Sequence, residues 1–283
     1  MQSIKWHLAH GRHLELGPQS RIMGILNVTP DSFSDGGKYV AADDALRQAL
    51  AMLDDGASII DVGGESTRPG ARQAEPALEQ KRVLPVIRQL SQQSNGLISV
   101  DTYRAATAQK AIEAGAHIVN DVWGLQREQD IAKVAADHGA GVVIMHTGRA
   151  REVRLTPIED QFDYFEKSLD IAARAGVSNE NIVLDPGFGF GKETLAVNLE
   201  LMARFERLSA LGFPLLVGVS RKRMLGSVTG LEPGDRDIAT AAASAILRLK
   251  GASIFRVHNV AANRDALAVA DAVFNHRSHH ANS

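Results

Sequence analysis

The sequence predicts a (β/α)₈ barrel, and three regularities support this fold class. Short apolar runs recur along the chain, and helix-length segments with apolar residues at three- and four-residue spacing separate them. Almost every run ends in a polar side chain, as expected when parallel strands point their carboxyl ends at one shared pocket. The length of 283 residues suits one large core and is typical of such a barrel.

The apolar runs define eight expected strands. Between them, residues 42–53 show the helical periodicity, and the pair Gly56-Ala57 indicates a helix end that leads into the next strand. An open doubly wound sheet would also alternate strands and helices, but it would concentrate ligand-capable residues at one switch point. Here there are eight strands, and ligand-capable residues follow almost every one of them, so the sequence favours the barrel. The expected strands are residues 22–26, 58–62, 97–100, 117–120, 141–145, 181–184, 214–218 and 253–257.

The chain is expected to form a single domain over residues 1–283, because no linker, low-complexity block or composition shift interrupts residues 20–275. Apolar and polar residues alternate from Trp6 to Leu16 around Gly11, which predicts that residues 1–20 contain a β-hairpin covering the amino end of the barrel. Residues 276–283 contain histidines but no carboxylate, so we expect a frayed, disordered tail rather than a metal site.

Composition narrows the range of partners and compartments. Hydrophobic residues make up 45% and charged residues 23%, and the formal net charge is −2 without any basic run, so neither nucleic acid nor an acidic membrane is an expected partner. The absence of cysteine excludes disulfides, thiolate metal sites and cysteine nucleophiles. The first residues lack the apolar core of a secretory signal, and the apolar run 238–247 is too short to span a bilayer. A cytoplasmic protein is therefore expected.

Asp101, Asn120 and Asp185 each follow an expected strand. Carboxylates and an amide that converge at a barrel mouth suit a flat heterocycle rich in N–H donors, because a carboxylate accepts two parallel N–H groups as it does from arginine. Any one of the three could instead cap the next helix, but capping is a poor explanation for all of them together.

Cationic residues follow the last two expected strands, at Ser220-Arg221-Lys222 and Arg256-Val257-His258. The corresponding loops of barrels commonly hold phosphate. Arg256 and His258 alternate along a strand end, so their side chains share one face. His146 also ends a strand, but a lone histidine there is more often structural.

Two glycine-bounded polar loops, Thr29–Gly37 and Gly63–Gly70, are expected to lie over the same mouth, where lid movement is plausible. The stretch 185–192 is similar to a phosphate-cradling loop only superficially. It lacks the Walker spacing and the Ser/Thr after its lysine, so that interpretation is rejected.

Motifs in a fixed order along residues 20–270 resemble those of the bacterial dihydropteroate synthases. They are GILNVTPDSFSDG at 24–36, DVGGESTRPG at 61–70, ISVDT at 98–102, ND at 120–121, DPGFGFGK at 185–192, SRK at 220–222 and RVH at 256–258. The resemblance implies a (β/α)₈ barrel that condenses 6-hydroxymethyl-7,8-dihydropterin pyrophosphate with 4-aminobenzoate. The products are 7,8-dihydropteroate and pyrophosphate, in folate biosynthesis. It also implies Mg²⁺, a homodimer and inhibition by sulfonamides.

The resemblance also implies the roles of individual residues. The carbon–oxygen bond is expected to break early, so catalysis needs stabilisation of the leaving charge and exclusion of water rather than a nucleophile. The catalytic set is Asn27, Arg68, Asp101, Asp185, Lys222, Arg256 and His258. Within the site, Asp101, Asn120, Asp185 and Lys222 hold the pterin, and Asn27, Arg68, Arg256 and His258 hold the pyrophosphate, with Asn27 also reaching Mg²⁺. Phe33, Thr67, Arg68, Pro69, Phe190, Ser220 and Lys222 surround the 4-aminobenzoate.

Two segments depart from the family pattern. Thr147–Arg151 stands in place of a Gly/Pro-containing loop, and Asn259 stands where an aspartate is common. Three alternatives remain: a methyltetrahydrofolate-binding methyltransferase, a non-catalytic pterin-binding paralogue, and a phosphate-binding isomerase or aldolase barrel. The first would not need the cationic sets, the second should have lost part of the loop set, and the third would not explain the acidic and amide residues.

Overall fold

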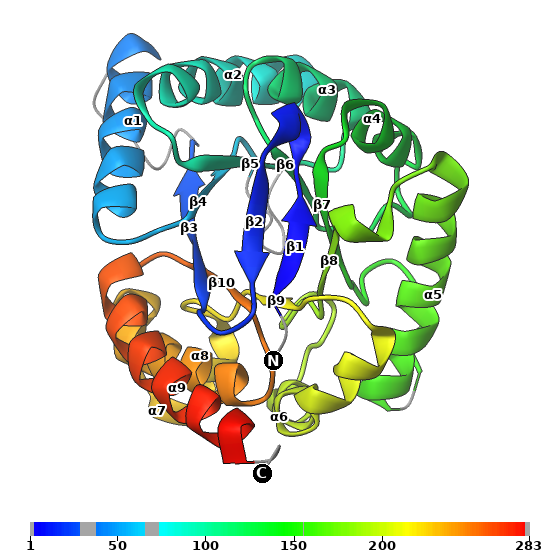
Figure 1. Ribbon diagram of the computed structural model, residues 1–283, viewed down its shortest axis with the longest axis vertical. Helices are drawn as coiled ribbons and strands as arrows, with labels where there is room; N and C mark the ends of the chain where they lie inside the picture. The colour runs from blue at the N-terminus through cyan, green and yellow to red at the C-terminus, as the bar shows by residue number, and fades with distance from the viewer. Residues whose placement is uncertain (1–2, 29–37, 66–73, 155, 281–283) are drawn as a thin grey trace.

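The computed structural model describes residues 3–28, 38–65, 74–154 and 156–280, and in it a parallel barrel is ringed by helices (Figure 1). The eight strands lie in the order β8-β7-β6-β5-β4-β3-β10-β9. A parallel bridge from Leu184 to Leu215 joins the two ends of this order, which confirms the closed barrel over the open sheet. The strands are β3 Arg21–Asn27, β4 Ile59–Gly63, β5 Leu97–Asp101, β6 Ile118–Asp121, β7 Gly141–Met145, β8 Ile182–Asp185, β9 Leu216–Val217 and β10 Ile254–Val257.

Helices follow the strands and cover the barrel from outside. The segment after β9 holds two helices, α7 and α8, before β10 begins. Gly56 ends the segment after α1 with a φ of +110°, a left-handed angle that glycine adopts without strain, as the sequence predicted. The α-helices are α1 Lys38–Asp54, α2 Pro76–Gln93, α3 Ala105–Glu113, α4 Asp130–His138, α5 Pro157–Ala175, α6 Leu195–Ala203, α7 Arg223–Thr229, α8 Asp237–Leu249 and α9 Val260–His280. Short 3-10 helices are η1 Ala9–Gly11, η3 Asn179–Asn181, η4 Phe205–Leu211 and η5 Pro233–Asp235.

The carboxyl-terminal stretch differs from its expectation. Residues 276–283 were expected to fray, but α9 continues through His280, and only residues 281–283 lie outside the described part of the chain. The stretch contains neither proline nor glycine, so nothing in its backbone chemistry stops the helix that precedes it.

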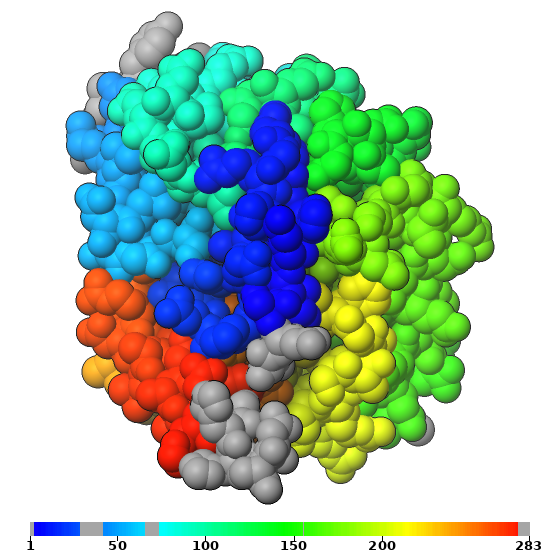
Figure 2. Space-filling view, viewed as in Figure 1, coloured from blue at the N-terminus to red at the C-terminus, as the bar shows by residue number. Residues whose placement is uncertain are grey.

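The amino end of the barrel is filled by an apolar layer and covered by the predicted hairpin. Strands β1 Ile4–His7 and β2 His13–Leu16 pair antiparallel, and they run across the centre of the face seen in Figures 1 and 2. Trp6 is 1% exposed, and its indole N–H donates to the carbonyl oxygen of Asn181 at 2.8 Å. One cluster contains Trp6, Leu8 and Leu16 together with one residue from each barrel strand: Met23, Ile59, Leu97, Ile118, Val143, Val183, Leu216 and Ile254.

A polar layer of side chains lies next to this apolar layer inside the barrel, toward the carboxyl ends of the strands. Side chains two residues apart on a strand point to the same face, so the residues two positions after the apolar layer also face the barrel interior. Most of that second layer is polar or small, which places the polar groups at the carboxyl ends of the strands. The layer comprises Ile25, Asp61, Ser99, Asn120, Met145, Asp185, Gly218 and Arg256.

Across the described ranges, no helix has both the length and the hydropathy that a bilayer crossing requires.

Candidate active site

Arg256 lies at the centre of the polar layer, between two carboxylates. Its Nε donates to Oδ2 of Asp61 at 2.7 Å, and its Nη2 donates to Oδ2 of Asp101 at 2.8 Å. The side-chain amide of Asn120 donates to the same oxygen of Asp61 at 3.0 Å. Strands β4, β5, β6 and β10 supply the four groups, with β3 between β10 and β4, so the barrel brings Asp101, Asn120 and Arg256 together.

Burial changes the acid–base behaviour of this group. Burial raises the pKa of Asp101 to about 7, with Arg256 opposing the shift and Asp61 adding to it. Burial by itself would lower the pKa of the Arg256 guanidinium. The negative charges of Asp61 and Asp101 raise this pKa by more, so the net shift is upward. Asp101 therefore changes charge near neutral pH, while Arg256 stays a cation.

Two buried oxygens in the layer have no hydrogen-bond partner in the described part of the protein, Oδ1 of Asp61 and Oγ of Ser99. The two residues face each other in the register of β4 and β5. A buried polar atom without a partner is destabilising, so both oxygens are suited to accept or donate a bond to a ligand or water in the barrel mouth.

Asp185 ends β8 and is held by its own backbone turn. Its Oδ1 accepts from the N–H of Gly187 at 2.8 Å. Gly187 has a φ of +62°, and a Cβ there would lie 2.0 Å from the carbonyl oxygen of His146, so no other residue fits. Burial raises the pKa of Asp185, and the nearby ammonium of Lys222 opposes that shift.

Lys222 approaches the same region from the loop after β9. Its ammonium donates to the carbonyl oxygen of Phe188 and lies 4.6 Å from the ring centroid of Phe190. Burial lowers its pKa to about 7, and Asp185 opposes this. The lysine thus faces both the carboxylate of Asp185 and the aromatic ring that was assigned to the second substrate.

Ser220 and His258 connect the ends of the loops after β9 and β10. Oγ of Ser220 lies 2.9 Å from Nδ1 of His258 and accepts from its backbone N–H at 3.1 Å. Arg221 instead donates to Asp237 at 2.7 and 2.9 Å. Asn259, one of the departures from the family pattern, donates to Asp237 at 3.0 Å. Asn259 thus bonds the same carboxylate that Arg221 contacts.

Asn27 ends β3, and its side chain faces the same space as Asp101. A Cβ on Gly63 would lie 3.6 Å from Oδ1 of Asn27 and 3.8 Å from Oδ2 of Asp101, so the glycine leaves room between them. The remaining predicted residues, Phe33, Thr67, Arg68 and Pro69, lie outside the described residues, as do Thr29–Gly37 and most of the second loop.

The second departure, residues 147–151, packs beside the site. The backbone N–H of Gly148 donates to the carbonyl oxygen of Phe190 at 3.0 Å, and the guanidinium of Arg149 lies 4.5 Å from the Phe190 ring centroid. The loop therefore supports one wall of the region assigned to 4-aminobenzoate.

Sequence reasoning omitted two residues that the structure places in or beside the site. Asp61 is fully buried and bonds both Asn120 and Arg256, although it ends an apolar run just as Asp101 does. The strand-end pattern includes Asp61, but the sequence analysis assigned it no role in the site. Lys192 carried no such signal, because its contacts depend on how the chain returns after β8.

Comparisons with known proteins agree with this geometry. The family described as "Pterin binding enzyme" matches residues 23–258. The dihydropteroate synthase of Bacillus subtilis is 47% identical over 255 residues, covering 90% of this chain and 88% of that protein. A Xanthomonas albilineans dihydropteroate synthase solved with 4-aminobenzoic acid has a TM-score of 0.89 at 40% identity, covering 95% and 98% of the two chains. A Yersinia pestis dihydropteroate synthase in a sulfonamide drug complex has a TM-score of 0.86 at 40% identity, covering 94% of this chain and 98% of that one.

The fold and the polar barrel mouth define a pterin-binding enzyme. The chain belongs to this family, among the dihydropteroate synthases.

Proposed function

We propose that this chain condenses 6-hydroxymethyl-7,8-dihydropterin pyrophosphate with 4-aminobenzoate at the carboxyl end of its barrel. The observation that carries the proposal is the buried layer in which Asp101, Asn120 and Asp185 face Arg256 and Lys222. Carboxylates in a water-poor pocket suit the guanidine-like edge of a pterin, which offers parallel N–H donors. Asp185 is the main anchor in this proposal, because its carboxylate lies buried beside a lysine and is fixed by Gly187.

The pyrophosphate is proposed to lie toward Asn27 and His258, with Arg68 and Arg256 contributing charge. Arg256 is already shared between two carboxylates, so it offers less net positive charge than an isolated arginine would. The raised pKa of Asp101, about 7, reduces the negative charge beside the leaving group. Interactions that strengthen as the pyrophosphate departs lower the barrier.

A magnesium ion fits the same position. Mg²⁺ prefers oxygen ligands and keeps several waters and substrate phosphates, so one side-chain oxygen such as Oδ1 of Asn27, beside the space left by Gly63, meets its needs. When bound, the ion would neutralise charge on the pyrophosphate.

The bond changes require no nucleophilic side chain. The carbon–oxygen bond breaks with its electron pair going to pyrophosphate. The amine nitrogen of 4-aminobenzoate then bonds to the pterin methylene and loses a proton to the released pyrophosphate. The protein holds the reactants in line and excludes water from the cationic methylene. The apolar layer and hairpin below the polar layer close the barrel from that side.

The direct test is formation of 7,8-dihydropteroate from the two substrates with Mg²⁺, beside a reaction without the metal. Product that depends on both substrates supports the proposal. A protein that forms none, but transfers a methyl group from methyltetrahydrofolate, would be the alternative methyltransferase.

We expect sulfonamides to inhibit by competing with 4-aminobenzoate, and a Yersinia pestis relative that is 40% identical has been solved with such a drug. Arg68 is proposed to contact both pyrophosphate and the arylamine, so tight drug binding should require pyrophosphate and Mg²⁺. Calorimetric titration with and without those ligands tests this, and the meta-amino isomer of the drug serves as the control. Equal affinity in their absence, or non-competitive kinetics, would contradict the proposed site.

A homodimer is also part of the proposal, and exposed hydrophobic side chains on two packed helices support it. Large hydrophobic side chains are exposed on neighbouring helices, including Ile238 at 83% and Val269 at 68%. Helices α8 and α9, which carry them, pack against each other. We expect Ile238→Asp to shift the protein from dimer to monomer in sedimentation experiments, whereas Val153→Asp, an exposed valine far along the chain, should not. A monomeric parent protein would refute the dimer.

A further inference from the structure

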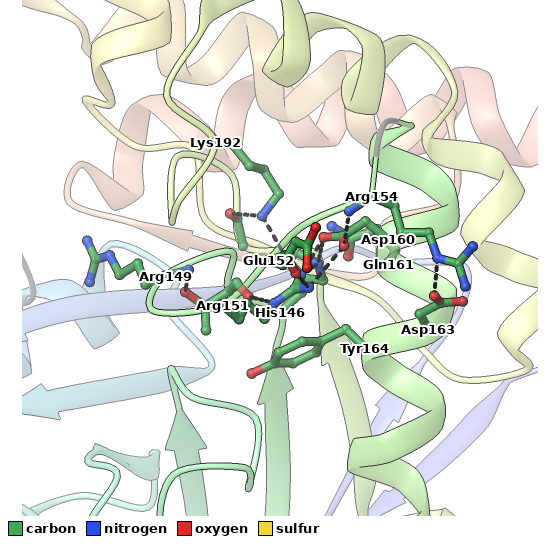
Figure 3. A network of polar contacts seen from close by, with 12 residues as sticks. His146, Arg149, Arg151, Glu152, Arg154, Asp160, Gln161, Asp163, Tyr164 and Lys192 are labelled. Carbon is green, nitrogen blue, oxygen red and sulfur yellow. Dashed lines mark hydrogen bonds and ion pairs between the residues drawn. The ribbon is translucent and has the colours of Figure 1, made fainter.

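A second buried polar cluster lies beside the proposed pterin site, and the proposed reaction does not use it (Figure 3). Nζ of Lys192 lies 2.9 Å from Nδ1 of His146, and Nε2 of His146 lies 2.8 Å from Oδ2 of Asp160. All three residues are buried, Lys192 being 7% exposed. The cluster joins the end of β7, the first turn of α5 and the segment after β8.

Hydrogen-bond chemistry fixes the direction of this chain of contacts. An ammonium group only donates, so Nδ1 of His146 accepts from Lys192, and the other ring nitrogen, Nε2, lies between Oδ2 of Asp160 at 2.8 Å and Nη2 of Arg151 at 2.9 Å. Burial lowers the pKa of His146 to about 3, and the neighbouring Lys192 adds to the shift. Burial alone would raise the pKa of Asp160, but hydrogen bonds from His146 and Arg151 hold it well below its usual range.

The same lysine reaches the backbone that holds Asp185. Nζ of Lys192 donates to the carbonyl oxygen of Gly187 at 2.8 Å, and the N–H of Gly187 donates to Oδ1 of Asp185 at 2.8 Å. The backbone N–H of His146 donates to the carbonyl oxygen of Asp185 at 2.8 Å. Lys192 and His146 therefore hold the Gly187 turn and the end of β8 from two sides.

We propose that Lys192 is a positioning residue, which orients the carboxylate of Asp185 for the pterin by fixing the Gly187 turn against His146. This inference rests on the proposed function, which assigns Asp185 to the pterin. A lysine suits the position because its ammonium donates to both partners at once. An apolar side chain of the same length would leave Nδ1 of His146 without this donor, and the Gly187 carbonyl would keep only its bond from the N–H of Phe190 at 3.1 Å.

Burying the charged ammonium of Lys192 costs free energy, and an uncharged side chain that only filled the space would not have this cost. Burial lowers the pKa of Lys192 to about 7, with Lys222 adding to the shift and Asp185 and Asp160 opposing it. A methionine would fill the same space without that penalty, so retaining the charge is consistent with a requirement for its hydrogen bonds.

A double-mutant cycle tests whether Lys192 acts through Asp185. The variants are Lys192→Met, Asp185→Asn and the double variant, with Lys133→Met as the control, since Lys133 is an exposed lysine that pairs with Asp137 on its own helix. Calorimetry gives the dissociation constants of 6-hydroxymethylpterin and, separately, of pyrophosphate with Mg²⁺. We expect Lys192→Met to weaken pterin binding roughly tenfold and to leave pyrophosphate binding unchanged. In the Asp185→Asn background, the same change should cause little further loss of pterin affinity.

Each outcome is decisive. Wild-type pterin affinity in Lys192→Met, or a full additional loss in the double variant, would overturn the positioning role. If Asp185→Asn alone left pterin affinity unchanged, the assignment of Asp185 in the proposed function would fail instead.

Two conservative changes at His146 keep the proposal testable if Lys192→Met does not fold. An asparagine places an acceptor oxygen near the position of Nδ1, whereas a glutamine amide reaches toward Nε2 and Asp160. We expect His146→Asn to keep pterin affinity near that of the wild type, and His146→Gln to lose roughly tenfold. The reverse ranking would show that Lys192 does not orient Asp185 through this contact.

Discussion

At the scale of residues, the geometry of the site depends on polar groups that bond two partners each. Arg256 was assigned to the pyrophosphate from the sequence, yet its guanidinium lies between Asp61 and Asp101. An arginine in that position also orients the carboxylates around it, so its loss would disturb both halves of the proposed site. Asp61 has the corresponding role from the other side, because one of its oxygens bonds both Arg256 and Asn120.

Replacing Asp61 by alanine tests this arrangement. The change leaves the buried amide of Asn120 without that acceptor and Arg256 with one carboxylate fewer, and breaking a buried charged pair costs about 3–5 kcal/mol. We expect denaturant unfolding to show a loss of that size together with a large fall in turnover. The control Asp137→Ala breaks an exposed pair with Lys133 and should change stability by about 1 kcal/mol or less. An Asp61→Ala enzyme with wild-type turnover would contradict the role.

At the scale of elements, the amino-terminal hairpin and the loops have separate tasks. Strands β1 and β2 cover the apolar end of the barrel, whereas the segments after β7, β8, β9 and β10 build the walls of the polar end. The two ends are separated by the length of the strands. Stability and ligand binding should therefore respond to different substitutions.

Trp6→Ala separates the two tasks. It removes a large buried side chain and its bond to Asn181, and such truncations cost about 3–5 kcal/mol. We expect a lower denaturation midpoint while the Michaelis constants at low temperature remain unchanged. Ile4→Ala in the same strand is the control, because Ile4 is 44% exposed and should lose far less. A raised Michaelis constant in folded Trp6→Ala would show that the two ends are coupled.

At the scale of the whole molecule, buried titratable groups make stability depend on pH in opposing directions. Burial lowers the pKa of His117 to about 4, and Arg12 and His10 add to this shift. Burial raises the pKa of Asp121 to about 6 and that of Asp101 to about 7. As pH falls from 6.5 to about 4, the unfolded chain gains a proton at His117 that the folded chain refuses, so stability falls. The two aspartates act oppositely, because they keep their protons longer when folded, and their contribution is lost as pH rises from 3.8 to about 6 or 7.

His117→Asn isolates the first of these effects. Nδ1 of His117 accepts from the backbone N–H of Ile98 at 3.0 Å, and an asparagine oxygen is able to take over that bond. We expect the stability advantage of the wild type over the variant to shrink as pH falls from 6.5 to 4.5. Unfolding free energies at several pH values measure it. A difference that stays constant with pH would mean that the pKa of His117 is not depressed.

The sequence by itself determined the architecture and much of the site. Apolar runs of strand length, helical periodicity between them and glycines at helix ends specify each element locally, so the strand positions and the hairpin were predicted within a few residues. Asp101, Asn120 and Asp185 were found because a residue that ends a barrel strand must face the mouth, whereas Lys222 was found as part of a cationic loop after a strand. That rule depends only on the alternation of side chains along a strand.

Only the tertiary structure decided which of these groups contact one another. Arg256 meets Asp61 and Asp101 because β10 pairs with β3, and β4 and β5 follow β3 in the strand order. Lys192 meets His146 because the segment after β8 folds back over the end of β7. These contacts join residues far apart in the chain, and local periodicity contains no information about such distances. These contacts form only when the barrel folds, because folding buries the polar groups together and lets them hydrogen-bond to one another.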